Sequence, residues 1–226
     1  KFRGLPLTSQ DNLFDIISQA QEIGWKVGVH VVGDAAMQMV LEAFEKADST
    51  SGIGVGGNAL EHAFSPVEGS IQRTKDLGLG VTLQHALVYA LGGNMCTYWG
   101  NQRASDCTPS RAWIDSGIIV GAGTDSPVTN YDPWLNIYGF ATRDTEVAGV
   151  LGPQHRISVP ETLYAYTMGS AKILRMDDSI GSIEVNKAAD FICLDQNPLD
   201  VPIDSVKETQ VSRTIVGGKI VFDASE

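Results

Sequence analysis

His30, His62 and Asp125 occupy comparable places in the sequence. Each lies at or near the carboxyl end of a short apolar run that is typical of a strand buried on both faces. In parallel α/β folds these strand ends form the active face, so side chains from different strands converge there. Two imidazoles and one carboxylate are ligand types for Zn²⁺ or a similar divalent ion. The sequence therefore predicts a metal site at these three residues, which needs further ligands to be complete.

Taken alone, each of these residues also fits an ordinary structural role. A single histidine in an apolar strand is more often a hydrogen-bonded core residue than a metal ligand. Asp125 also fits a turn, and Asp34 is most simply a helix cap. The combination of His30, His62 and Asp125, rather than any one of them, favours the metal site.

Two further side chains are candidate substrate contacts. His85 ends the third expected strand, and we expect it to contact substrate or to anchor a loop rather than to bind the metal. Arg111 opens a short helix, where it either binds a substrate carboxylate or lies on the surface beside an acidic loop. Residues 52–57 match G-x-G-x-x-G, but they follow a helix and lead into a strand, the reverse of the order in a dinucleotide site.

Strands and helices alternate along most of the chain. Strands are expected at 27–32, 59–63, 80–84 and 118–123, and helices around 9–23, 37–44, 66–77, 110–116, 134–141 and 160–174. Such an alternation predicts a parallel sheet. Because a complete (β/α)8 barrel takes about 250 residues and eight strands, four strands predict only half of a TIM-type barrel.

Two other segments have a different pattern. Residues 86–109 have no clean period and contain Gly92-Gly93, so we expect a long loop that shapes the substrate pocket. From Gly181 onward, short β segments are expected at 189–194, 211–216 and 219–222, with a hairpin turn at 217–218. We predict a partial barrel over residues 1–176 and a β-strand appendage over residues 177–226.

Composition narrows the possible partners. The chain has 226 residues with 27 acidic and 16 basic side chains, which gives a net charge of −11. This charge disfavours nucleic acid and an anionic membrane surface as partners. No apolar stretch approaches the roughly 20 residues of a membrane span. The three cysteines form no C-x-x-C pair, and their odd number indicates a reducing compartment or burial, so we expect a cytoplasmic protein.

Several blocks of the sequence resemble the amidohydrolase superfamily, in the branch called amidohydrolase family 3. The most diagnostic block is Gly-Ser-Ile-Glu at 181–184 followed by Lys-Ala-Ala-Asp-Phe at 187–191. The resemblance covers nearly the whole chain in the order of the family, with further matching blocks at 29–36, 60–63, 123–128, 132–134, 170–172 and 216–221.

The resemblance implies a metal-dependent hydrolase on a (β/α)8 barrel, with His30, His62 and Asp125 on the fifth, sixth and eighth strands. Asp125 would take the proton from a metal-activated water and deliver it to the leaving amine. The implied substrates are small molecules with a non-peptide carbon–nitrogen bond, such as an amide, urea or cyclic amide. A non-catalytic scaffold and a metal-assisted isomerase or lyase on the same barrel are the alternatives.

Two parts of the family's metal site have no counterpart in the chain: the first-strand His-x-His pair and the fourth-strand Lys or Glu. Together with the four expected strands, this predicts the C-terminal portion of an enzyme, strands five to eight plus part of a composite β-sandwich. We expect this chain alone to bind Zn²⁺ weakly and to be inactive. It would need the missing N-terminal half of the barrel, or else it would self-associate through its open sheet edge.

Overall fold

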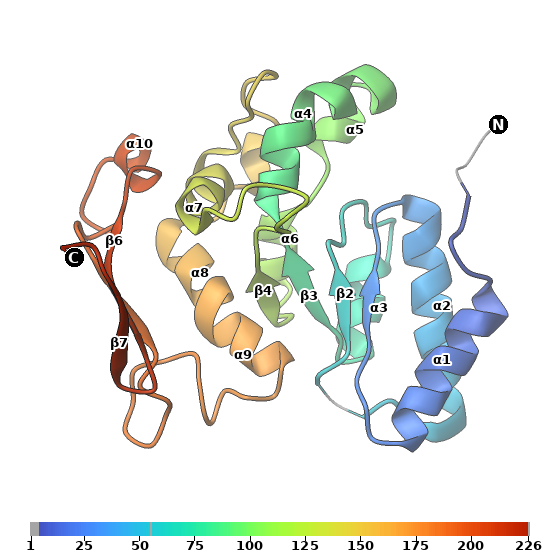
Figure 1. Cartoon of the computed structure of the whole chain (residues 1–226). Helices are drawn as coiled ribbons and strands as arrows, with labels where there is room; N and C mark the ends of the chain where they lie inside the picture. Colours follow the sequence, from blue (N-terminus) through green and yellow to red (C-terminus); the bar gives the residue numbers. More distant parts are fainter. Residues whose placement is uncertain (1–4, 55, 226) are drawn as a thin grey trace.

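The core of the fold is a four-stranded parallel sheet (Figure 1). The computed structural model describes residues 5–54 and 56–225. The register places His30 opposite Glu61, Glu61 opposite Thr82, and Thr82 opposite Gly121. The predicted α/β class with a parallel sheet is confirmed. The strands lie side by side in chain order: β1 (Gly28–His30), β2 (Ala59–Glu61), β3 (Gly80–Leu83) and β4 (Val120–Ala122).

The two faces of this sheet differ in polarity, because successive side chains of a strand point to opposite faces. Leu60 and Val81 pack in one buried cluster with Phe44 and Trp113 from the surrounding helices. His30, Glu61 and Thr82 alternate with these apolar residues and belong to the other face. Helix α1 (Gln10–Glu22) precedes the first strand, and the helices between and after the strands include α2 (Asp34–Ser51), α3 (Ser70–Asp76), α6 (Ser110–Asp115), α7 (Pro133–Thr142) and the short 3-10 helix η1 (Pro153–His155).

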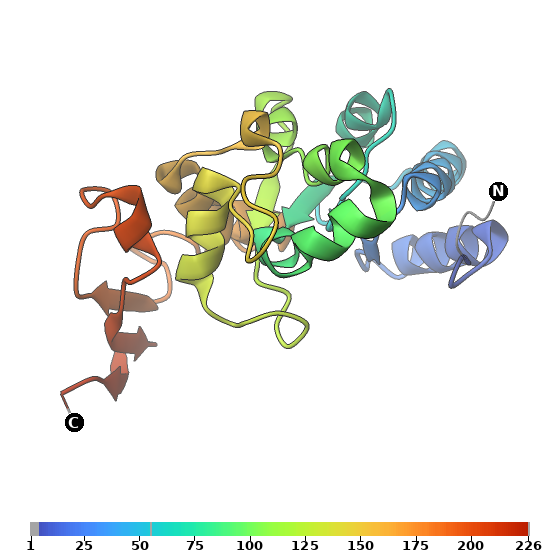
Figure 2. The same ribbon diagram turned by 90° about the horizontal axis from the view of Figure 1, so that it is seen from above.

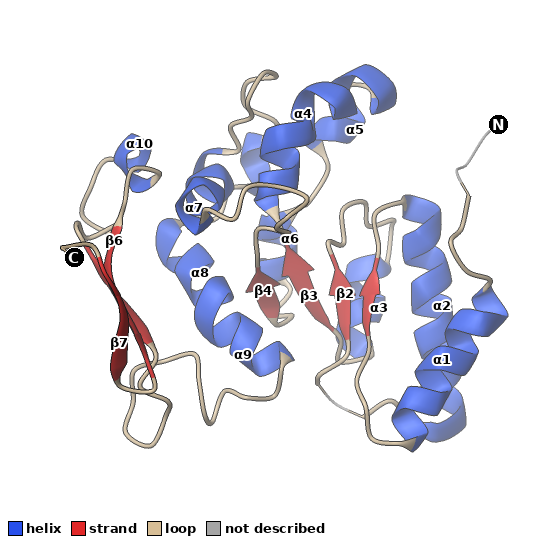
Figure 3. Cartoon of the chain, viewed as in Figure 1, coloured by secondary structure: helices blue, strands red, loops and turns tan. Residues whose placement is uncertain are grey.

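The stretch after β3 is helical, so the loop predicted over residues 86–109 is wrong. Helices α4 (His85–Trp99) and α5 (Asn101–Ser105) lie above the carboxyl ends of the strands, as Figure 3 shows. The glycines at 92–93 serve close packing rather than a turn, since a Cβ on Gly92 would lie 2.8 Å from the Thr145 side chain. Val88 and Met95 of α4 are buried. Tertiary packing here outweighs the weak local helix propensity.

The helix predicted over residues 160–174 consists of three consecutive parts. They are α8 (Val159–Tyr164), the π-helical turn η2 (Ala165–Gly169) and α9 (Ser170–Ile173). A Cβ on Gly169 would overlap the carbonyl oxygen of Val120, so the π turn brings the helix backbone directly onto β4. Among the described residues, no helix is long and apolar enough to cross a membrane.

A second, antiparallel sheet lies at the far end of the molecule from α1 (Figure 2). It consists of β5 (Phe191–Leu194), β6 (Val211–Val216) and β7 (Lys219–Asp223), with the short helix α10 (Ile203–Val206) between β5 and β6. Gly217 and Gly218 have φ angles of 56° and 76°, which suit the tight turn between β6 and β7. The strands lie where the sequence predicts them, and the division into two units at residue 176 stays a prediction.

A fully buried arginine, Arg143, lies at the end of α7. Its guanidinium donates to three backbone carbonyls: Nε to Leu151 at 2.8 Å, Nη1 to Thr108 at 3.0 Å and Nη2 to Cys107 at 2.8 Å. Burial lowers the pKa of Arg143 to about 10, so the side chain is still a cation at neutral pH. One side chain therefore ties the segment after α5 and the segment before η1 to the end of α7.

The variant Arg143→Met is expected to lower the free energy of unfolding by about 3 kcal/mol, because three buried carbonyls lose their donor. Urea or thermal unfolding measures the loss. Arg103→Met is the matched control, since Arg103 is half exposed and pairs with Asp34 at 2.8 Å. Such a surface pair contributes about 0–1 kcal/mol. Equal losses in the two variants would contradict the structural role given to Arg143.

Candidate metal centre

His30 and His62 contact each other at the carboxyl edge of the parallel sheet. His30 is the last residue of β1, and His62 directly follows the last residue of β2. Their ring centroids lie 4.6 Å apart and their planes are 78° apart, an edge-to-face arrangement. The contact follows from the register, because parallel pairing of His30 with Glu61 aligns the ends of the two strands.

The surroundings of His30 favour its neutral form. Burial lowers the pKa of His30, and His62 lowers it further, whereas the charges of Asp125 and Glu61 raise it. Because the net direction is downward, the ring is neutral at neutral pH and keeps a free nitrogen lone pair, as a metal ligand must. Asp125 lies three residues beyond β4, close enough for its charge to act on His30.

The histidine pair fits part of a metal centre. Two imidazoles supply nitrogen ligands of the kind that Zn²⁺ binds. Within residues 5–54 and 56–225, however, no group of three or more His, Cys, Asp and Glu side chains is arranged to hold a metal ion. The roles of His30, His62 and Asp125 as metal ligands, and of Asp125 as the proton-transfer group, stay predictions.

The backbone is strained at His62 and Asp125, the two candidate ligands that lie just beyond the ends of their strands. His62 has a φ of 73° and Asp125 a φ of 63°. A non-glycine residue in this left-handed region costs on the order of 1–3 kcal/mol, and such residues cluster at functional sites. Hydrogen bonds hold both conformations: the His62 N–H donates to the Thr82 carbonyl at 2.9 Å, and the Asp125 carbonyl accepts from Val128 N–H at 2.8 Å.

A row of polar side chains runs from His62 across β2 and β3. His62 Nδ1 lies 2.7 Å from Gln84 Oε1, and Gln84 Nε2 donates to Thr82 Oγ1 at 3.0 Å. Thr82 in turn donates its hydroxyl to Glu61 Oε2. Sequence reasoning missed this row because it depends on the cross-strand register. The available signal is the period of two that places residues 82 and 84 on one face of the extended chain.

Asn136 links the first turn of α4 to the loop that follows β4. Its side chain is 1% exposed. Its Oδ1 accepts from the Ala86 N–H at 2.5 Å, and its Nδ2 donates to the Gly123 carbonyl at 2.7 Å and to the Tyr166 hydroxyl. Because Gly123 lies two residues before Asp125, this second residue missed from the sequence helps to position the Asp125 loop.

His85 lies in the interior rather than beside His30 and His62. Its ring is fully buried, with its centroid 5.6 Å from that of Phe140, and Nε2 lies 3.3 Å from the Asp144 carbonyl. Burial, followed by the charge of Arg143, lowers the pKa of His85 to about 3. The surroundings suit the expected loop anchor, and the alternative role as a substrate contact stays a prediction.

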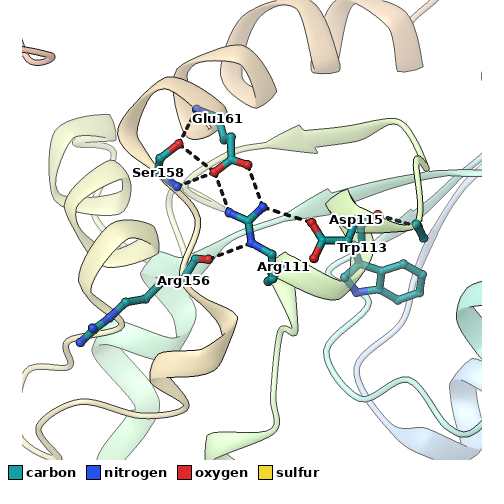
Figure 4. Close-up of polar contacts among 7 residues, drawn as sticks. Arg111, Trp113, Asp115, Arg156, Ser158 and Glu161 are labelled. Carbon is teal, nitrogen blue, oxygen red and sulfur yellow. Dashed lines mark hydrogen bonds and ion pairs between the residues drawn. The ribbon is translucent and has the colours of Figure 1, made fainter.

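Arg111 forms a two-pronged ion pair with Glu161 (Figure 4). Nη1 and Nη2 donate to the two Glu161 oxygens at 2.8 and 2.7 Å, and Nη1 also lies 3.2 Å from Asp115 Oδ1. Glu161 also accepts from Ser158 in the capping box that begins α8. Arg111 thus joins α6 to α8, and its role as a substrate contact stays a prediction.

Comparisons with known proteins agree with the resemblance found in the sequence. The sequence profile of the amidohydrolase family matches residues 2–222. The chain therefore belongs to the amidohydrolase family. A curated relative, the N-substituted formamide deformylase of Arthrobacter pascens, is 29% identical over 226 residues, an alignment that covers 97% of this chain and 41% of the deformylase.

Solved structures share the fold. An uncharacterised metal-dependent hydrolase from Pyrococcus horikoshii matches with a TM-score of 0.77 and 24% identity over 90% of this chain and 41% of its own. An adenosine deaminase from Xanthomonas campestris with bound Zn matches with a TM-score of 0.68 and 21% identity over 96% of this chain and 49% of its own. The chain spans less than half the length of each of these relatives.

Because His85 is buried, we expect the protein to lose stability as the pH falls. Its folded-state pKa of about 3 lies below the ordinary value of 6.5. As the pH falls below 6.5, the unfolded chain binds a proton that the folded chain does not, so stability is lost towards pH 3 at up to about 1.4 kcal/mol per pH unit. The variant His85→Gln is expected to have a shallower slope of unfolding free energy between about pH 6 and pH 4. Parallel curves for the two proteins would contradict this prediction.

The variant Asn136→Ala leaves the Ala86 N–H and the Gly123 carbonyl without their partners. We expect the free energy of unfolding to fall by about 1–3 kcal/mol, because both groups lie around a buried side chain. Asn130→Ala is the matched control: Asn130 is exposed, and its side chain accepts one bond, from Asp132 N–H at 3.0 Å. A similar unfolding curve for both variants would show that the Asn136 link is unimportant.

Proposed function

We propose that the chain is the carboxyl-terminal part of a metal-dependent amidohydrolase that cleaves a non-peptide carbon–nitrogen bond in a small amide, urea or cyclic amide. His30 and His62 would bind the metal, with Zn²⁺ as the expected ion, and Asp125 would complete this part of the site. The observation that carries the proposal is the contact between the two histidine rings, 4.6 Å apart at the ends of neighbouring strands. Family membership supports the reaction class.

The residues divide the chemistry between them. A bound divalent ion would activate water and polarise the scissile carbonyl. His30 and His62 would offer ring nitrogens to hold that ion, and Asp125, three residues beyond β4, would bring its carboxylate to the same edge of the sheet. Asp125 would accept the proton of the attacking water at its carboxylate and then deliver it to the leaving nitrogen, first as general base and then as general acid.

The remaining part of the enzyme would complete the barrel. In this proposal β1 to β4 are strands five to eight of a (β/α)8 barrel, and β5 to β7 belong to a sandwich shared with earlier strands. The coverage of 41% of the formamide deformylase supports this division. The chain would pair with an N-terminal half that brings the other ligands, or otherwise self-associate. Its cysteines Cys96, Cys107 and Cys193 are free, which supports a proposed cytoplasmic location.

In the complete protein, Asp125→Asn is expected to lower kcat by about 10²–10⁴-fold, the usual contribution of a proton-transfer group. The measurement is hydrolysis of a panel of N-formyl amines, ureas and cyclic amides. Removal of metal by a chelator should abolish turnover, and added Zn²⁺ should restore it.

Asp34→Asn is the control for this variant. Asp34 follows β1 at the same edge of the sheet, but it begins α2 and pairs with Arg103. The turnover of the Asp34→Asn protein should therefore match that of the unchanged protein. Full activity in Asp125→Asn, or in protein stripped of metal, would overturn the proposed function.

A further inference from the structure

The side chains of His62, Gln84, Thr82 and Glu61 form one continuous hydrogen-bonded row. The separations are 2.7 Å from His62 Nδ1 to Gln84 Oε1 and 3.0 Å from Gln84 Nε2 to Thr82 Oγ1, and the Thr82 hydroxyl then contacts Glu61 Oε2. His62 and Gln84 are each 6% exposed, so water has little access to the first bond. The row crosses from β2 to β3 because Glu61 lies directly opposite Thr82 in the register.

The chemistry of the last member sets the direction of every bond in the row. A carboxylate only accepts, so the hydrogen between Thr82 and Glu61 belongs to the Thr82 hydroxyl. With its one hydrogen used, Thr82 Oγ1 is an acceptor towards Gln84, which must present its NH₂ group. The Gln84 carbonyl oxygen then faces His62, and since this oxygen is also only an acceptor, His62 Nδ1 must carry a hydrogen.

The same count of hydrogen-bond donors and acceptors disfavours the opposite orientation of the Gln84 side-chain amide. If its carbonyl faced Thr82, the Thr82 hydroxyl would have to donate there, and the Thr82 oxygen would meet the Glu61 carboxylate with no hydrogen between them. Gly28 helps to keep Glu61 in place: a Cβ at residue 28 would lie 2.8 Å from Glu61 Oε1, so the absent side chain leaves room for the carboxylate against β1.

We propose that Glu61, acting through Thr82 and Gln84, holds neutral His62 in the tautomer with hydrogen on Nδ1 and a free lone pair on Nε2. Glu61, Thr82 and Gln84 are then positioning residues that select the ligating nitrogen before any metal arrives. The link to metal binding rests on the proposed function, whereas the tautomer itself does not. Partners of this kind around a metal-binding histidine typically change metal affinity by about 10–100-fold when mutated.

The test is a long-range ¹H–¹⁵N correlation spectrum of the metal-free protein labelled at its histidine rings, recorded at a pH where the rings are neutral. Unchanged protein should show His62 as the Nδ1–H tautomer. Glu61→Gln is the sharpest variant, because an amide at residue 61 donates as well as accepts and lets the row reverse, so a substantial Nε2–H population should appear. Thr82→Val interrupts the row and should also give a mixture, whereas Thr82→Ser keeps the hydroxyl and should restore the Nδ1–H form.

Zn²⁺ titration of the same variants separates this inference from the proposed function. We expect the dissociation constant of the complete protein to rise by about 10–100-fold in Glu61→Gln and Thr82→Val, and to stay close to the original value in Thr82→Ser. An Nε2–H tautomer in unchanged protein, or a tautomer that is the same in all variants, overturns the inference even if Zn²⁺ binds. Tautomers that follow the row in a protein that binds no metal support the inference and count against the proposed function.

Discussion

The candidate site depends on three backbone hydrogen bonds between neighbouring strands. Val31, directly after His30, donates to the Glu61 carbonyl at 2.9 Å, and the His62 N–H donates to the Thr82 carbonyl at 2.9 Å. Gly123, before Asp125, donates to the Leu83 carbonyl at 3.1 Å. Each of these three strand ends is thus held by a neighbouring strand. Because side chains alternate between faces, a register shift of one residue would turn the histidines towards the buried apolar face.

Because side chains alternate between the two faces, the residues that stabilise the fold and those of the candidate site lie on opposite faces of the same short strands. Leu60 and Val81 contribute to the buried cluster beneath the helices, and burial of each such side chain stabilises the fold by about 1.5–3 kcal/mol. Their neighbours Glu61 and Thr82 are paired across the other face. A strand of three or four residues can therefore anchor the sheet with one face and orient a candidate ligand with the other.

The sequence predicts those parts of the fold that are encoded locally. Short, largely apolar runs identify all four parallel strands, and strand-end positions identify His30 and His62 as neighbours. The prediction fails for α4, where the pair of glycines at 92–93 carries a turn signal and only the packed structure shows that Gly92 is needed for contact with Thr145. Gln84 and Asn136 were missed for a related reason, because their partners are set by register and by loop packing rather than by nearby sequence.

Strand β3 supplies none of the three candidate ligands, yet it orients His62. β3 binds the backbone of His62 through the Thr82 carbonyl, and the adjoining Gln84 binds its ring. These two attachments hold His62 in a left-handed conformation that would otherwise be unfavourable. Two points of attachment fix both the position of the Cα atom and the rotation of the ring, which one bond could not do. The geometry of the histidine pair is therefore a property of the sheet as a whole.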